Sequence, residues 1–386
     1  MLVGELTPEQ TMILDTVDRL LARHLPPEEV RRRDAAAEPP AHLLPLMAEA
    51  GLLGLAVPAS AGGAGGDWQT MGLVQERLGY RAFMAAVLFN RVTCFGLMTL
   101  LNAGTEAQRE RWLPALMAGQ GGFALALTEP GAGSDAGALT TRARREGEGW
   151  RITGRKTWIS GASEALRMVV AARTDAGSRG GRGVSLFLVP PDAPGVAMTR
   201  LEKVGNRCSL SWDIGLDDVA VGPDALIGAP GQGFAVLQRT LFHARSGLAA
   251  AVVGTAQAAV DAAAAHARER AQFGRPIGAF QVIAHRLARM QTEVDLARLM
   301  ARALARGIDA GADCGRLAAQ AKYVATETLK RVTEDGMQIM ASAGYAEGSD
   351  MQRYWRDARL YTFGEGSSEI QLDLIARDMG LGGALA

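Results

Sequence analysis

Cysteine, aromatic residues and net charge are all scarce in this sequence. Its three cysteines, Cys94, Cys208 and Cys314, lie far apart and form neither a CxxC pair nor a disulfide framework, so a reducing compartment is the default. The five histidines show no metal-ligand spacing, and no metal site is predicted. Lysine and arginine (41) balance aspartate and glutamate (41), so the charge gives no indication of nucleic acid or an anionic membrane as a partner.

Long uncharged apolar runs are lacking too. The stretch Ser246–Val260 is shorter than the roughly 20 residues of a membrane helix, and the N-terminal MLVGELTPEQ is neither a signal peptide nor an arginine-rich transit peptide. We therefore expect a soluble, cytoplasmic protein. Aromatic residues make up 5% of the chain while alanine and leucine abound, which favours helices. At about 100–200 residues per domain, 386 residues predict two or three domains.

The first part of the chain has a helical pattern. Thr7-Pro8-Glu9 is a favourable helix start, with a capping threonine and proline at the first helical position. The charged run Glu28–Asp34 is interpreted as a solvated segment, and the glycine-rich Ala59–Asp67 as a flexible loop. Further helices are predicted at His42–Ala50, Trp68–Tyr80, Ala82–Asn102 and Glu106–Met117.

The pattern changes after Gly119. Short β-rich runs, separated by glycine, proline and aspartate, predict strands at Phe123–Leu127, Trp150–Ser160, Met168–Arg173, Val184–Val189, Val196–Leu201 and Ser209–Leu216. Thr174–Gly183 has the composition of a mobile hairpin loop. Long helices then follow at Gly233–Arg270, Gln281–Gly307, Arg316–Ala341 and Ser367–Met379.

These patterns predict a mainly α fold with a central β domain. We expect an N-terminal α-helical domain at residues 1–120, a small β-barrel or sandwich at 121–229 and a C-terminal helical bundle at 230–386.

Glu365 is the candidate catalytic residue. It lies between Gly364 and Gly366 on a predicted tight turn, and Ser367 follows at the start of the last helix. A carboxylate in an apolar setting has a raised pKa, which suits a general base, and a helix start is a favourable seat for a phosphate. An isolated Gly-Glu-Gly is more often a solvated helix boundary, so the other motifs are needed to decide.

Three other motifs have the residue types of a ligand site. LTEPGAGSD (127–135) follows a strand, but more strand comes next instead of a helix, which excludes a Rossmann turn. Its exposed backbone N–H groups and the Thr128 and Ser134 hydroxyls suit a polar ring edge and a phosphorylated ligand. Trp158-Ile159-Ser160, taken alone, is compatible with an ordinary core. RAQFGRPIGAFQ (270–281) joins two long helices and is either a charged corner or a phosphate clamp through Arg270.

Taken together, these phrases resemble the signatures of the acyl-CoA dehydrogenases. The family carries RDA(K/R) followed by (Y/G)EG(T/S)xEIQ, an almost unchanged LTEPGAGSD, W-I-(T/S) and RxQFGxPIxxFQ, all in this order. The resemblance spans essentially the whole chain and implies FAD as cofactor. It assigns FAD contacts, partly from a neighbouring subunit, to Leu127, Thr128, Gly133, Ser134, Trp158, Ser160, Arg270, Gln272, Phe273, Phe280, Gln281, Gln338, Ser367 and Glu369. Substrate contacts are implied for Ser134, Arg245 and Gly366.

The resemblance also implies a reaction, α,β-dehydrogenation of an acyl-CoA in fatty acid metabolism. Glu365 would remove the α-proton while the β-carbon passes a hydride to flavin N5. The Glu365 backbone N–H and a ribityl hydroxyl would hold the thioester oxygen. Electrons would leave through an electron-transferring flavoprotein, and the enzyme would be a homodimer or homotetramer. Some relatives keep the base one residue before Arg245, where this chain has Ala244, so Glu365 is the single candidate.

Two departures leave alternatives open. Phe242 replaces an aspartate that contacts CoA in many relatives, so an acyl-carrier-protein thioester, handled by a dehydrogenase or an oxidase, is the alternative substrate. Gly364 replaces a frequent tyrosine and predicts a wider acyl pocket. A non-catalytic flavoprotein of the same fold and a colourless helical scaffold are the alternatives outside catalysis.

Overall fold

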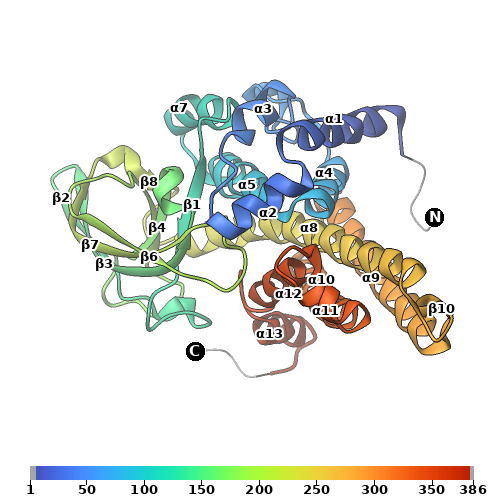
Figure 1. The fold of residues 1–386 in the computed structure, drawn as a ribbon. Coiled ribbons are helices and arrows are strands. Elements are labelled where there is room, and N and C mark those ends of the chain that lie inside the picture. Colours follow the sequence, from blue (N-terminus) through green and yellow to red (C-terminus); the bar gives the residue numbers. More distant parts are fainter. Residues whose placement is uncertain (1–5, 383–386) are drawn as a thin grey trace.

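The computed structural model describes residues 6–382 and has two helical parts with a β part at one end (Figure 1). The predicted fold class, mainly α with a central β domain, is confirmed. The two helical parts share one continuous hydrophobic core, which includes Val17 and Leu78 from the first part and Val252 and Leu329 from the second. The β part has a core of its own. The three-domain division by residue number stays a prediction.

The N-terminal part begins as predicted. The Thr7 side chain accepts a hydrogen bond from the Gln10 N–H and the Gln10 side chain accepts one from the Thr7 N–H, a reciprocal cap with Pro8 at the first helical position. Its α-helices are α1 (Pro8–His24), α2 (Pro27–Ala36), α3 (Leu43–Glu49), α4 (Trp68–Arg81), α5 (Phe83–Asn90), α6 (Thr99–Ala103) and α7 (Glu106–Met117).

One prediction in this part is wrong, and a second is confirmed with an irregular centre. The charged run Glu28–Asp34 is not simply solvated: it forms most of α2, whose Val30 and Asp34 side chains are buried. The helix predicted at Ala82–Asn102 is α5 and α6 joined by a π-helix, η2 (Arg91–Met98). π-turns concentrate at functional sites, and this one begins at the buried Arg91, which donates to the Gly161 carbonyl at 2.6 Å.

The β part is one curled, mostly antiparallel sheet (Figure 1). The strand order is β6-β7-β3-β2-β4-β5-β8, and β1 pairs with β4 in parallel. A strand at Arg142–Glu146 was not predicted, because its alternation contains a single apolar buried residue. The strands are β1 (Gly122–Ala126), β2 (Arg142–Glu146), β3 (Gly149–Ser160), β4 (Ala165–Arg173), β5 (Val184–Val189), β6 (Val196–Leu201), β7 (Ser211–Val221) and β8 (Leu226–Ile227).

The C-terminal part is built on α8, a long helix that runs from the sheet to the far end of the molecule (Figure 1). With 37 residues and a rise of about 1.5 Å per residue, α8 spans about 55 Å. The elements after the sheet are α8 (Gly233–Glu269), the short strands β9 (Ala271–Gln272) and β10 (Arg275–Pro276), α9 (Gln281–Asp309), α10 (Gly315–Met340), α11 (Ser342–Tyr345), α12 (Asp350–Tyr361) and α13 (Ser368–Asp378). The helix α12 was not predicted.

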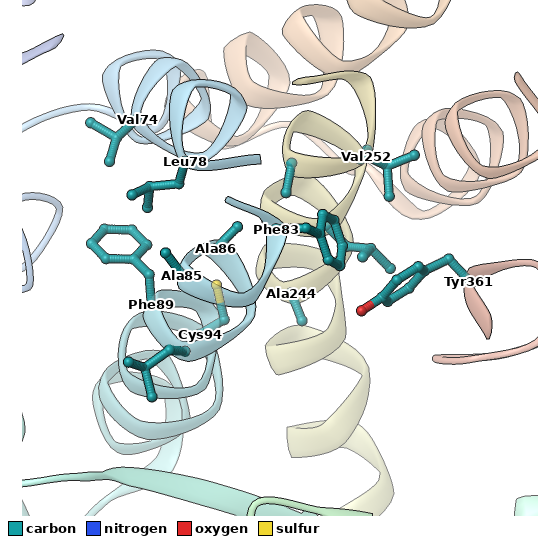
Figure 2. Packing of buried hydrophobic residues seen from close by; sticks show 14 of the residues in the cluster. Val74, Leu78, Phe83, Ala85, Ala86, Phe89, Cys94, Ala244, Val252 and Tyr361 are labelled. Atoms are coloured by element: carbon teal, nitrogen blue, oxygen red, sulfur yellow. The ribbon is translucent and has the colours of Figure 1, made fainter. Parts of the chain in front are cut away.

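Close packing of α8 against the N-terminal helices positions the end of α12. Gly79 of α4 lies so near α8 that a Cβ there would come within 2.0 Å of the Ala251 carbonyl oxygen. Figure 2 shows Ala244 and Val252 of α8 in this shared core, with the Phe83 ring pointing toward Tyr361, the last residue of α12. The two ring centroids are 4.7 Å apart in an edge-on arrangement. The core therefore anchors the chain four residues before Glu365.

Two helices, Phe83–Ala103 and Gly233–Glu269, are long and apolar enough to cross a membrane by length and composition. However, 83% and 72% of their most apolar windows are buried inside the protein. They therefore have the burial of core helices.

Candidate active site

Glu365 lies on a tight turn between α12 and α13, as the glycines beside it predict. Its backbone φ is +56°, a left-handed value uncommon for a residue with a Cβ, and Gly366 follows at +92°. The residue is half-buried overall, but its Oε2 atom is enclosed and has no hydrogen-bond partner among residues 6–382. Burial raises the pKa of this carboxyl, and the charges of Arg245 and Lys322 oppose that rise. The carboxyl group therefore has an enclosed oxygen without a partner in the described part of the chain, and a pKa above that of an ordinary glutamate.

Two buried cations from different helices face this turn. Arg245 of α8 is 8% exposed, and its Nε is enclosed without a partner in the described part of the chain. Lys322 of α10 is fully buried, and its Nζ donates to the Gly366 carbonyl at 2.7 Å. Burial lowers the pKa of Lys322 to about 8, against the attraction of Glu365. The predicted residues Glu365, Arg245 and Gly366 are thus brought together.

Sequence reasoning missed Lys322 and Gln371. Both side chains donate to the same Gly366 carbonyl, Gln371 through Nε2 at 3.0 Å. A signal for Lys322 was present, because it shares the apolar face of α10 with the buried residues Ala318, Ala325 and Leu329. A lone lysine at that spacing indicates a buried cation with a specific partner.

The predicted residues Ser367 and Glu369 lie directly after the turn. The Ser367 hydroxyl accepts from the Ile370 N–H and so caps α13, while Glu369 is exposed in the first turn of that helix. The N-terminus of α13 is therefore adjacent to Glu365.

The LTEPGAGSD turn and the Trp158 segment form a second group. The Thr157 N–H donates to the Thr128 carbonyl at 2.9 Å, so the two segments lie side by side. The buried Lys156 donates to the Leu127 carbonyl at 3.0 Å and to Glu129 at 2.7 Å, and these bonds join strand β3 to the turn. The structure thereby brings Leu127 and Thr128 next to Trp158.

Trp158 is not a core residue. A register shift in the β3–β7 pairing between Lys156 and Ile159 produces a bulge, and Trp158 on that bulge has φ of +58° and is 56% exposed. Bulges of this kind re-aim a side chain and are frequent next to active sites. Ser160 lies two residues on, with its hydroxyl 3.2 Å from that of Ser211.

Gly133 and Ser134 are exposed at the end of the same turn. A Cβ at Gly131 or Gly133 would meet nothing within 4 Å, so the space beside this backbone is open. An exposed planar indole, hydroxyl groups and uncovered backbone fit the edge and face of a flat heteroaromatic ring. The residues at this place therefore suit a flavin ring.

The RAQFGRPIGAFQ motif lies elsewhere. It forms the hairpin between α8 and α9, at the opposite end of α8 from the sheet (Figure 1). Phe273 at its tip has φ of +52° and is 93% exposed, and its ring is 6.1 Å from that of Phe280. The predicted site residues Arg270, Gln272 and Gln281 are also exposed. Within one chain, the structure does not bring this group together with Trp158.

Gln338 is also separate from the catalytic turn. It lines an open hollow of about 400 Å³ with Met337, Ala341, Ser342, Tyr345 and Ala346, at the end of α10. Among the described residues, no group of three or more histidine, cysteine, aspartate or glutamate side chains is arranged to hold a metal ion.

Comparison with known proteins agrees with this fold and defines the chain as a flavin-dependent oxidoreductase of acyl thioesters. Family models described as the N-terminal, middle and C-terminal domains of acyl-CoA dehydrogenase match residues 7–120, 124–219 and 231–380. The chain belongs to the acyl-CoA dehydrogenase family. Members of this family are FAD-dependent flavoproteins.

Three relatives illustrate the range of similarity. A probable acyl-CoA dehydrogenase of Bacillus subtilis is 38% identical over 376 residues, which cover 97% of this chain and 99% of the relative. The structure of butyryl-CoA dehydrogenase from Megasphaera elsdenii is 30% identical, with a TM-score of 0.93, and the match covers 98% of this chain and 100% of that one. The prolyl acyl carrier protein oxidase AnaB is 26% identical, with a TM-score of 0.93 and the same coverage.

Proposed function

We propose that this protein catalyses α,β-dehydrogenation of an acyl-CoA thioester, with Glu365 as the base that removes the α-proton. The observation that carries the proposal is the enclosed, unpartnered Glu365 Oε2 on a left-handed turn, facing two buried cations. When bound, FAD supplies the acceptor for the two electrons and the β-hydrogen. The residues that would hold its ring are Thr128, Trp158 and Ser160, and Ser134 would reach the flavin or the substrate.

The chain's own groups support proton abstraction at this place. Burial raises the pKa of Glu365 above that of a solvated glutamate, which suits a general base, while Arg245 and Lys322 favour its charged form. The backbone N–H of Glu365 makes no hydrogen bond within residues 6–382. It is free to donate to the thioester oxygen and so to stabilise the negative charge that develops when the α-proton leaves.

A second copy of the chain would complete the cofactor site. The hairpin that carries Arg270 and Phe273 is separated from Trp158 by most of the roughly 55 Å length of α8. Residues at opposite ends of this helix cannot contact one cofactor within a single chain. We therefore propose a homodimer or homotetramer in which one copy offers its hairpin to the FAD of the other, and light scattering of the purified protein measures that state.

A carrier-protein thioester is the second candidate substrate. Phe242 stands where many relatives have an aspartate for CoA, and its half-buried ring packs against the shared core instead of presenting a charge. The similarity to a prolyl acyl carrier protein oxidase supports the same candidate. An electron-transferring flavoprotein as electron acceptor and a cytoplasmic location stay predictions from the sequence.

The first test is the visible spectrum of the purified protein, followed by anaerobic titration with straight-chain, branched and aryl acyl-CoA thioesters. Bleaching of the flavin band by one of them supports the proposal. A yellow protein that only acyl-carrier-protein thioesters bleach supports the second candidate, and peroxide formation in air identifies an oxidase.

The second test is Glu365→Gln, which keeps the size of the side chain but removes the base. We expect kcat to fall by about 1,000-fold or more, with flavin still bound. Glu347→Gln, an exposed glutamate before α12, is the control and should behave as wild type. Turnover near the wild-type rate in Glu365→Gln would refute the assignment of the base.

A further inference from the structure

The catalytic turn is held in an unfavourable backbone conformation. Glu365 at φ +56° carries a Cβ in the left-handed region, and Gly366 at +92° follows it directly. A Cβ at Gly366 would come within 2.7 Å of the Gln371 amide nitrogen, so the surroundings are tightly fitted. Such a conformation persists only when neighbouring groups hold it.

Helix α10 holds the turn on both sides. On one side, the Gly366 carbonyl accepts from Lys322 Nζ at 2.7 Å, and Gln371 of α13 supplies a second donor at 3.0 Å. On the other side, Ser368 Oγ donates to Glu327 Oε1 of α10 at 2.7 Å, and the Ser368 N–H donates to the Thr362 carbonyl at 2.7 Å. Lys322 and Gln371 are both fully buried.

Lys322 differs from the other fully buried lysine of the chain. Lys156 is paired with the carboxylate of Glu129 at 2.7 Å, as buried ammonium groups usually are. Lys322 has no carboxylate within salt-bridge distance in the described part of the chain, and its ammonium group donates to a backbone carbonyl. Burying a cation with a neutral partner is costly for stability. This arrangement is therefore better explained by what the ammonium does for the turn.

The charge of Lys322 also acts on Glu365. The titratable groups that face Glu365 are Arg245 on α8, Lys322 on α10, and the thiol of Cys94 and the phenol of Tyr361, which burial keeps neutral. Lys322 in turn faces Arg245, Glu365 and, further along, Glu327 and Glu369. Two cations thus favour the ionised form of a carboxyl whose pKa burial raises.

We propose that Lys322 is a positioning residue for the catalytic base: its ammonium group binds the Gly366 carbonyl, holds Glu365 in the left-handed turn and presents a positive charge to that turn. This inference rests on the proposed role of Glu365 as base. It assigns to α10 a part in catalysis that does not require contact with substrate or cofactor.

The test compares two variants that remove a donor from the same carbonyl. Lys322→Met removes the donor and the charge, whereas Gln371→Met removes a donor and leaves the charge in place. Lys322→Arg keeps both. Arg331→Met is the control, because Arg331 is an exposed cation of the same helix that pairs with Glu293 on α9. Each holoenzyme is assayed for kcat and KM as a function of pH, with the acyl-CoA that bleaches the flavin fastest, and for flavin content.

We expect Lys322→Met to lower kcat by about 100-fold, as a misplaced catalytic group does, with KM and flavin content changed much less. Its acidic limb of the kcat profile should move to higher pH, because the carboxylate loses a neighbouring cation. Gln371→Met should lower kcat without moving that limb, and Lys322→Arg should keep the limb at its wild-type position. Arg331→Met should match wild type.

A readout independent of turnover is the infrared band of the Glu365 carboxylate. It is isolated by subtracting the spectrum of Glu365→Gln and is titrated in the absence of substrate. In Lys322→Met the carboxylate should protonate at a higher pH than in wild type.

Wild-type kcat in Lys322→Met, or a loss of activity with neither the acidic limb nor the infrared titration moved, would overturn the proposal. If Lys322→Met does not fold, the other two variants decide: wild-type kcat in Gln371→Met, or a shifted limb in Lys322→Arg, counts against it. Failure of the proposed function is recognised separately, because Glu365→Gln would then be active whatever the Lys322 variants do.

Discussion

Around the LTEPGAGSD turn and Trp158, the buried pair of Lys156 and Glu129 is the interaction whose removal should cost the most stability. Lys156 Nζ donates to Glu129 Oε1 at 2.7 Å and to the Leu127 carbonyl at 3.0 Å. Glu129 also accepts from the N–H groups of Thr140 and Thr141, at 2.7 and 3.0 Å. Both charged side chains are enclosed, with 0% and 4% of their side-chain surface exposed.

Lys156→Met keeps the length of the side chain and removes the charge. It leaves the Glu129 carboxylate buried without its cation and the Leu127 carbonyl without that donor. Breaking one partner of a buried pair costs about 3–5 kcal/mol, a large part of the about 5–15 kcal/mol by which folded domains are stable. Because Leu127 begins the turn that would bind flavin, the flavin content of the purified protein should fall as well.

The assay is urea unfolding, monitored by tryptophan fluorescence, with and without saturating FAD. Lys156→Met and Glu129→Gln should each lower the free energy of unfolding by about 3–5 kcal/mol. The double variant should lose about 2–3 kcal/mol less than the sum of the two, because both single changes remove the same ion pair. Arg155→Met is the matched control, because the neighbouring Arg155 pairs with Asp213 at an exposed position and should cost about 1 kcal/mol or less. A cost below about 1 kcal/mol for Lys156→Met, or additive single changes, would refute the reasoning.

Two further predictions concern acid stability and helix packing. Burial would raise the pKa of Glu129, but hydrogen bonds from Lys156 and neighbouring groups outweigh this and lower it to about 2. The stability contributed by the Glu129 carboxylate is therefore present above the ordinary glutamate pKa near 4.5 and is lost as pH falls from there toward 2. Burial lowers the pKa of its partner Lys156 to about 8, so the test of the pair belongs below that pH. Acid unfolding that begins at the same pH in Glu129→Gln as in wild type would contradict this. In α4, Gly79→Ala should cost about 2–3 kcal/mol because its Cβ meets the Ala251 carbonyl at 2.0 Å, whereas Gly72→Ala, with 3.9 Å of space, should stabilise by about 0.5–1 kcal/mol. Thermal unfolding of the two variants checks the sign, and equal shifts would contradict the packing argument.

Much of the fold followed from local pattern. The helix at Pro8 has its cap and proline in the sequence, and the strands at 150–160 and 184–189 have apolar residues at the required spacing. The turn at Glu365 was also predictable, because the glycines around it indicate the bend that the structure contains. In each case the determining residues lie within a few positions of one another.

The elements that were missed depend on distant partners. Asp34 is buried in α2 because Arg356, 322 residues away, binds its carboxylate. Lys322 donates to the Gly366 carbonyl, 44 residues away in the sequence; its place on the apolar face of α10 indicates burial but does not identify this partner. The exposure of Trp158 follows from a bulge in the pairing of β3 with β7, which local sequence does not specify.

The sequence by itself therefore determined the order of helical and β segments, the family signatures and the identity of the candidate base, because each depends on residues that are close together in the chain. Only the tertiary structure decided which cations face Glu365, how its turn is held and that the hairpin at Phe273 lies far from Trp158 in one chain. The physical reason is that burial and charge at a site are sums over helices brought together by the shared core, and no single segment contains that sum.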